Sequence, residues 1–470
     1  MSAAVLMLLT LFVILGITAT SLARCLHAST GYQCQPRKSH HWGIYAPYFT
    51  STSKLPTILP DQCTVTFAQI LSRHGARFPN KPNLDDCRRV MQQIKSTARS
   101  YTGQYKFLEH YRFDLREGDL TSFGQSQMVH SGAKFFERYA HLAQKGDIFV
   151  RSASSQRIVM SAVNFTSGFH QALSHRVNGK TQQTMTDSAE YMSHGNVTPQ
   201  PILVLPETTG QNSSLAPATC SAFNPGPYDK DNRDKWAAKF VPPIMKRLNH
   251  DLGTSLQLND VVPLMDMCPF STVADVEGRI SPFCALFTPQ EWKSYNYYYT
   301  ISVYYGWATG NPLGPSQGIA WGNELIARLT RKPVALHGPV NATLARDPNT
   351  FPLDRSLYAD FTHENHMVSM FFAMGLYDPR PPVPNDRNPD AFDTATASPF
   401  ASRMYVERMQ CGAKGRRKTQ ELVRVLINDR VVPLRGCGAD AYGRCPLDRF
   451  ITGLRYIRHG GDWNKCFHKK

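Results

Sequence analysis

The stretch VTFAQILSRHGARFP, residues 65–79, joins an apolar run to a loop that carries two arginines and a histidine. The run TVTFAQILS (64–72) has the β-branched and apolar composition that is typical of a buried strand. In α/β proteins, polar groups that follow such strands meet at the carboxyl edge of the sheet and form the site there. The stretch therefore predicts an α/β fold with its site in RHGARFP.

Two other segments show the same order of a short strand and a polar loop. In DIFVRSASSQR (147–157) the loop opens on an arginine, and in SLYADFTHEN (356–365) the strand-like YADF precedes a His-Glu pair. Helical composition marks 84–100 and 121–142, the second with Thr121 as its expected N-cap. Three such strands predict an α/β sheet with its site at the carboxyl ends of the strands.

The composition suits a globular protein with an anionic partner. Of 470 residues, 42% are hydrophobic and 19% charged, and the net charge of +16 favours acidic ligands. No zinc-finger spacing, aromatic RNA-binding signature or basic heptad accompanies the charge, so we expect no nucleic-acid partner. A phosphorylated substrate fits better, although basic residues spread over a solvated surface explain the charge equally well.

The N-terminus predicts export. Residues 5–17 form one apolar run, which small and polar residues follow as far as Ala23, as in a secretory signal peptide spanning 1–23. The run is too short to predict a membrane span, although the lack of a preceding Lys or Arg leaves an uncleaved anchor as an alternative. Eleven cysteines also favour an oxidising compartment. We expect a secreted, extracellular glycoprotein without stable membrane association, with N-x-S/T sequons at Asn164, Asn196, Asn212 and Asn341.

The loop RHGARFP has the residue types that bind and transfer a phosphoryl group. Arginine donors match phosphate oxygens two at a time. A histidine between Arg73 and Arg77 has its cationic form disfavoured, so its ring is a neutral nucleophile that can form a phosphohistidine. We expect Gly75 to let the anion approach the backbone. The alternative is a polar loop in which the arginines only form ion pairs.

At this point the sequence resembles the histidine acid phosphatases and, within them, the fungal phytases. RHGARFP matches the family motif R-H-G-x-R-x-P, and the similarity covers nearly all of the mature chain. Further similar stretches are GYQC (31–34), YAPYF (45–49), VRSASSQR (150–157), CPFSTVA (268–274), NPLGPSQG (311–318), NELIARLT (323–330), FFAMGLY (371–377), LINDRVVPL (426–434) and GGDWNKCF (460–467).

The resemblance implies a role for each matching residue. His74 is the expected nucleophile and Glu364 the expected proton donor, without a metal or other cofactor. The phosphoryl group would be held electrostatically. The residues expected to hold it are Arg73, Arg77, Arg151 and His363.

Glu364 departs from the family, because fungal phytases usually carry aspartate after the histidine. Glutamate has a similar reference pKa, about 4.3 against about 3.9, so donation at acid pH is still expected. Its side chain is one methylene longer, and a displacement of about 1 Å can cost ~10²-fold in rate. The multiple inositol polyphosphate phosphatases also place a glutamate close behind this histidine.

Substrate preference follows from the resemblance and from a second departure. Many fungal phytases have paired lysines before a Y-Y-G that lines the pocket, whereas here residues 301–306 read ISVYYG. We expect a monomeric acid phosphatase that most readily acts on phytate through a phosphohistidine. Two alternatives stay open, a broad-specificity acid phosphatase, which the missing lysines favour, and a non-catalytic inositol-phosphate-binding protein. The aromatic run 295–299 is expected to pack within a helix rather than to bind substrate.

The resemblance also implies the domain layout and the disulfides. The histidine phosphatase fold, a mixed α/β sheet flanked by helices, would comprise 24–169 and 311–470, with 170–310 as an inserted, mainly helical domain. The turn-rich composition of 205–231 and 379–393 separately predicts that both are surface loops. Cys87 is left unpaired, as an inert buried thiol or a reactive one. The expected pairs are Cys25–Cys34, Cys63–Cys411, Cys220–Cys466, Cys268–Cys284 and Cys437–Cys445.

The stretch DFTHENHM, residues 360–367, raises a metal site as an alternative. Its H-E-x-H spacing is one residue short of the H-E-x-x-H that binds zinc on a helix. The anion site expected at RHGARFP makes a metal unnecessary. His366 is therefore expected to be an exposed or packing residue of the following helix.

Overall fold

The computed structural model describes residues 25–27, 29–143, 148–177, 200–385, 388, 390–412 and 419–467. The predicted signal peptide and the sequon at Asn196 lie outside these residues. None of the described helices has the length and apolar character that crossing a membrane would need.

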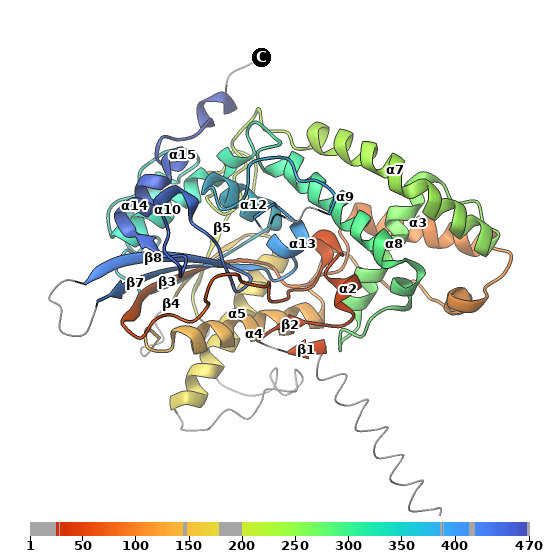
Figure 1. Ribbon diagram of the computed structural model, residues 1–470, viewed down its shortest axis with the longest axis horizontal. Coiled ribbons are helices and arrows are strands. Elements are labelled where there is room, and N and C mark those ends of the chain that lie inside the picture. The colour runs from red at the N-terminus through yellow and green to blue at the C-terminus, as the bar shows by residue number, and fades with distance from the viewer. Residues whose placement is uncertain are drawn as a thin grey trace, which may run out of the picture.

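The centre of the molecule is an eight-stranded sheet in the order β10-β8-β7-β3-β6-β4-β5, with β9 paired to β8 (Figure 1). β3, β6, β4 and β5 run parallel, and β7, β8, β9 and β10 add antiparallel pairs, so the predicted mixed sheet is confirmed. Its strands are β3 (Cys63–Arg73), β4 (Ile148–Ala153), β5 (Ile202–Leu205), β6 (Leu357–Thr362), β7 (Arg403–Cys411), β8 (Gln420–Ile427), β9 (Arg430–Val431) and β10 (Cys445–Pro446), and β1 (Leu26–His27) and β2 (Gly31–Tyr32) pair separately.

Helices cover both faces of this sheet. In Figure 1, α4 (Ser122–Tyr139) and α5 (Gln156–Val177) lie below it, and α10 (Ile319–Thr330) and α12 (Glu364–Ala373) lie above it. Thr121 caps α4 as predicted, since its side chain accepts a hydrogen bond from Gly124 N. The other elements near the sheet are α11 (Ala342–Arg346), α14 (Leu447–Gly453), α15 (Arg455–Arg458), η4 (Pro315–Gly318), η5 (Arg435–Cys437) and η6 (Trp463–Cys466).

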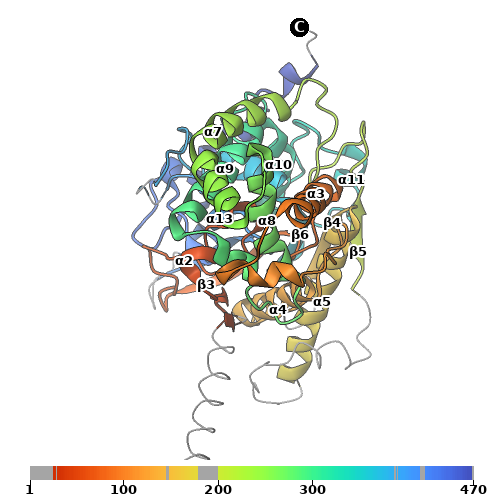
Figure 2. The ribbon, with the colours of Figure 1, turned by 90° about the vertical axis from the view of Figure 1, so that its right-hand side faces the viewer.

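A second apolar core belongs to a helical lobe, which faces the viewer in Figure 2. It contains the fully buried Trp42, Phe270 and Trp292, and it draws on segments from both ends of the chain. Its elements are α2 (Pro36–Ser39), η1 (Gly43–Tyr45), α3 (Lys81–Thr97), η2 (Gly103–Glu109), α7 (Gly226–Leu252), α8 (Leu258–Ala274), η3 (Pro282–Leu286), α9 (Pro289–Trp307) and α13 (Thr394–Ala397).

The helical lobe is therefore not the continuous insert, 170–310, that we expected. β5 lies within that range but forms the edge of the main sheet, while α3 lies outside it and packs against α8. β5 has only four residues, which is too short to be recognised as a strand from the sequence. The apolar face of α3 packs against α8, which places α3 in the helical lobe. The loop 205–231 also differs from expectation, because residues 213–217 are buried.

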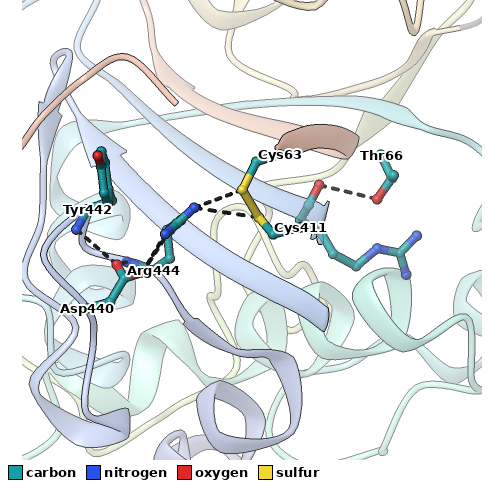
Figure 3. The surroundings of a disulfide bond; sticks show 7 residues. Cys63, Thr66, Cys411, Asp440, Tyr442 and Arg444 are labelled. Atoms are coloured by element: carbon teal, nitrogen blue, oxygen red, sulfur yellow. Dashed lines mark hydrogen bonds and ion pairs between the residues drawn. A yellow bond between two sulfur atoms is a disulfide. The ribbon is translucent and has the colours of Figure 1, made fainter. Parts of the chain in front are cut away.

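All five expected disulfides are present, and Cys87 is free and buried. Burial raises the pKa of the Cys87 thiol well above its usual value, which favours the inert interpretation. Cys63 and Cys411 face each other directly across β3 and β7, and the Arg444 guanidinium points at their sulfurs (Figure 3). This disulfide joins two residues that are 348 positions apart in the sequence. It links the start of β3, the strand that leads to RHGARFP, to the end of β7.

Candidate active site

The carboxyl ends of the four parallel strands bring charged side chains from distant parts of the chain together. β3 ends at the RHGARFP loop, β6 at His363-Glu364, β4 at the start of α5, and β5 just before Glu207. The side chains that meet there are Arg73, His74, Arg77, Arg157, Glu207, His363 and Glu364.

His74 has the protonation state of a nucleophile. Its Nδ1 lies 2.8 Å from the carbonyl oxygen of Gly75, which can only accept a hydrogen bond, so Nδ1 carries the proton and Nε2 its lone pair. Burial, together with the positive charges of Arg73 and Arg77, lowers the pKa of His74 well below its usual value. The ring is therefore neutral, as predicted from its position between two arginines.

Gly75 packs closely against the start of α4. A Cβ on this residue would lie 2.3 Å from the carbonyl oxygen of Gly124, and one on Gly124 would lie 1.9 Å from that of Ala76. The two glycines thus let the nucleophile loop pack directly on the start of α4. The approach of an anion to the backbone at Gly75 stays a prediction.

Arg73 is fixed from behind by the backbone and by an aromatic ring. Its Nη1 donates to the carbonyl oxygens of Ile44 and Ser398, and its guanidinium lies 4.5 Å from the centre of the Phe400 ring. Burial lowers the pKa of Arg73 to about 10, so it stays cationic. The guanidinium is thereby held in place before any anion binds.

Several hydrogen-bond donors of this cluster have no acceptor in the protein. Among the described residues, no acceptor is present for the buried Arg73 Nη2, Arg77 Nε and Arg157 Nε. A buried donor without a partner costs free energy, about 1–3 kcal/mol. Three such donors beside one neutral histidine form a site that is built for an anion.

Glu364 lies within this cluster, at the start of α12. Its Oε2 is 3.0 Å from Arg73 Nε and 3.8 Å from His74 Nε2. Burial would raise the pKa of Glu364, but the charges of Arg73 and Arg77, with a smaller effect of His363, lower it to about 2. The Glu364 carboxylate thus pairs with Arg73, and it is ionised in the free protein.

His363 has a partner at each ring nitrogen. Nε2 is 2.8 Å from Glu207 Oε2, and Nδ1 is 3.3 Å from Arg157 Nη2. The centres of the His363 and His74 rings are 6.0 Å apart. His363 is therefore beside the nucleophile, where the sequence predicts it.

Arg151 is not part of this cluster, and its predicted contact with phosphate is wrong. Its Nε and Nη2 each donate at 2.8 Å to Asp360, and Nη2 also lies 2.7 Å from Glu324. Arg151 sits within β4, directly across from Asp360 of β6. The Arg151 guanidinium is thus paired with two buried carboxylates, which gives it a structural role.

Arg157 and Glu207 belong to the cluster although the sequence did not lead us to expect them there. Arg157 ends the quoted stretch VRSASSQR, six residues after Arg151, and lies in the first turn of α5 rather than in the strand. A signal was present, since a residue beyond a strand's end is better placed to reach the sheet edge. Glu207 likewise follows the short β5, in a loop that we had assigned to the surface.

One group in the described residues could also hold a metal. The ligand atoms of His74, His363 and Glu364 all lie within 4.8 Å of one another. The guanidiniums of Arg73, Arg77 and Arg157 surround the same atoms, and their charge opposes a cation and favours an anion. The donor set thus fits a phosphoryl group better than a metal ion.

Two neighbouring features pack as the sequence predicts. His366 is buried in α12 with its ring against Trp307, and burial lowers its pKa to about 3. On α9, Tyr295 and Tyr299 donate to the buried Asp266 instead of facing a ligand. The 301–306 segment, ISVYYG, has no basic residue and so supplies no cation, and its Val303 is buried.

The chain matches the family model for the histidine phosphatase superfamily (branch 2) over residues 64–428. It is 44% identical over 461 residues to Phytase A of Aspergillus oryzae, covering 96% of this chain and 95% of the relative. Identity to Phytase A of Penicillium oxalicum is also 44%, over 452 residues and 94% of both chains.

Solved structures share the fold. The phytase from D. castellii superposes with a TM-score of 0.72 at 20% identity, over 91% of this chain and 87% of that one. A multiple inositol polyphosphate phosphatase of Bifidobacterium longum, in complex with inositol hexasulfate, gives 0.60 at 13% identity, over 90% and 98%.

Proposed function

The chain belongs to branch 2 of the histidine phosphatase superfamily and is a phosphoric monoester hydrolase, and we propose that it acts as a phytase through a phosphohistidine on His74. The observation that carries the proposal is the neutral His74 ring, with its Nε2 lone pair among three guanidiniums that have unpaired donors. The phytases that are 44% identical to it support phytate as the substrate.

In the first step, Nε2 of His74 attacks phosphorus as the bond to the ester oxygen breaks. Arg73, Arg77, Arg157 and His363 hold the oxygens of the transferring group, which stabilises its negative charge. Glu364 gives its proton to the leaving oxygen, so that a neutral alcohol departs. The products of this step are the alcohol, phosphohistidine and the Glu364 carboxylate.

In the second step, the Glu364 carboxylate takes a proton from water as the water oxygen attacks phosphorus. The bond between phosphorus and His74 breaks, which releases inorganic phosphate and restores the neutral ring. Glu364 is again protonated, so both steps balance.

Glu364 must gain a proton before the first step, although its pKa is about 2 in the free protein. Its contact with Arg73 lowers that pKa, and a phosphoryl group competes for the same guanidinium. We infer that substrate binding displaces the carboxylate from Arg73, which removes this stabilisation of the anion. Activity at acid pH is the expected result.

The proposal is tested by comparing kcat/KM on phytate and on p-nitrophenyl phosphate at one acid pH. A phytase releases phosphate from phytate at least as efficiently as from the aryl ester. A strong preference for the aryl ester would instead support a broad-specificity acid phosphatase, which the absence of lysine at 301–306 favours. A protein that binds phytate without hydrolysing either ester would contradict catalysis.

Secretion is part of the proposal, supported by five disulfides and by the apolar N-terminal run.

The sequon at Asn164 is a poor glycan acceptor, because the side chain is buried in α5 and donates to the carbonyl oxygen of Met160. Asn212 is exposed, whereas Asn341 caps α11. The monomeric state and the absence of a nucleic-acid partner stay predictions.

A further inference from the structure

We propose that Glu207 is a positioning residue for phosphate recognition, whose carboxylate holds the His363 ring so that Nδ1 faces the phosphoryl group. The inference rests on the proposed function, because it assigns a task within the same site. It concerns a residue that touches neither the nucleophile nor the reacting atoms and acts through His363.

The Glu207 carboxylate is itself held by the loop between β4 and α5. Oε1 accepts from the backbone nitrogen of Ser155 at 2.6 Å, and Oε2 accepts from the Ser155 hydroxyl at 3.0 Å. The Glu207 nitrogen donates to the Ser154 hydroxyl at 3.1 Å. Side chain and backbone are thus both fixed to the loop that supplies Arg157, two residues after Ser155.

The remaining contact of this carboxylate fixes the His363 ring. Burial raises the pKa of Glu207, but its bonds to His363 and Ser155 outweigh this and lower the pKa to about 2, so the group is ionised and can only accept. Nε2 of His363, 2.8 Å away, therefore carries a proton. The ring cannot turn over without losing this bond, which leaves Nδ1 directed at Arg157.

The arrangement gives His363 two states that suit an empty and an occupied site. With Nδ1 unprotonated, it accepts from Arg157 Nη2. With both nitrogens protonated, the ring donates to Glu207 through Nε2 and to a phosphoryl oxygen through Nδ1, while Arg157 is released for the same anion. Carboxylates that orient a histidine in this way change ligand affinity by about 10–100-fold when they are removed from metal sites.

The competing interpretation is that Glu207 only ties β5 to the loop 154–155. Both interpretations predict some loss of thermal stability when Glu207 is replaced. Either interpretation also allows weaker phosphate binding, because the same loop supplies Arg157. Only the positioning role predicts a change in the protonation of the His363 ring, so that change is the deciding measurement.

The experiment compares the wild type with Glu207→Gln and Glu207→Ala, and uses Glu421→Gln, an exposed position on β8, as the matched control. Calorimetry measures the Kd of inorganic phosphate, kinetics on p-nitrophenyl phosphate separate KM from kcat, and thermal melting reports folding. ¹⁵N-histidine NMR spectra, assigned with His363→Asn, report the protonation of each ring nitrogen.

We expect Glu207→Gln to melt within a few degrees of the wild type and to bind phosphate about tenfold more weakly, with KM raised more than kcat is lowered. Glu207→Ala should have a larger effect, and His363 should lose its fixed Nε2 proton in both. Wild-type Kd, KM and His363 signals in a folded Glu207→Gln protein would overturn the inference. If the wild type hydrolyses neither ester, the proposed function fails, while phosphate binding and the NMR spectra still test Glu207.

Discussion

Two clusters of arginines lie against the same sheet and have different partners. Around Asp360, Arg151 and Arg328 meet two carboxylates, those of Asp360 and Glu324. Around His74, three guanidiniums meet two carboxylates, those of Glu364 and Glu207, and unpaired donors occur there as they do on Arg328. The first cluster is balanced in charge and the second is not. A buried arginine therefore indicates an anion site only where its carboxylate partners are too few.

The largest expected effect comes from removing the nucleophile. His74→Ala should lower kcat on both esters by about 10⁵-fold or more, because it removes the neutral nitrogen that forms the bond to phosphorus. Wild type incubated with ³²P-labelled substrate and quenched in alkali should retain label that is stable to base and lost in acid, and the variant should not. Label of equal intensity in the variant would contradict the assignment.

The next prediction tests the two clusters directly. Arg157→Gln should lower kcat/KM by about 10²–10³-fold with little change in melting temperature. The reason is that the substitution removes a guanidinium that donates to the transferring phosphoryl group. Arg151→Gln should instead destabilise the fold by about 3–5 kcal/mol, because it leaves Asp360 and Glu324 buried without their main partner.

The readouts for this pair are urea unfolding and kcat/KM normalised to folded protein. If folded Arg151→Gln lost activity as severely as Arg157→Gln, the assignment of a structural role to Arg151 would be wrong. The contrast between the two clusters would also fail if Arg157→Gln behaved like a simple destabilised protein.

Proton donation gives the third effect, which depends on the leaving group. Glu364→Gln should slow phytate hydrolysis by about 10²-fold, because an alkoxide is a poor leaving group without a proton. Hydrolysis of p-nitrophenyl phosphate should fall much less, since the phenolate leaves readily. Equal losses on the two esters would mean that Glu364 serves another step.

The two clusters also differ in how well the sequence predicted them. The strand ends at Arg73 and Thr362, the histidine between two arginines and the five disulfides were all predictable, because each depends on local pattern or on the resemblance. Arg151 was confused with Arg157, since VRSASSQR does not reveal where β4 ends and α5 begins. Glu207 could not be found, because only the pairing of β5 with β4 brings it to His363.

The smallest effect concerns stability against acid, where both clusters contribute. Glu364 has a folded pKa of about 2, below its unfolded value of about 4.3, so its contribution is complete above pH ~4.5 and is lost as the pH falls towards 2. Asp360, whose pKa is also depressed, through Arg151 and Arg328, contributes with the same sign. Glu364→Gln should therefore have a lower urea midpoint than the wild type at pH 6 and a smaller difference at pH 3. The remaining acid sensitivity of the variant then reports the Asp360 cluster, and parallel pH curves for the two proteins would show that Glu364 is not held by Arg73 in solution.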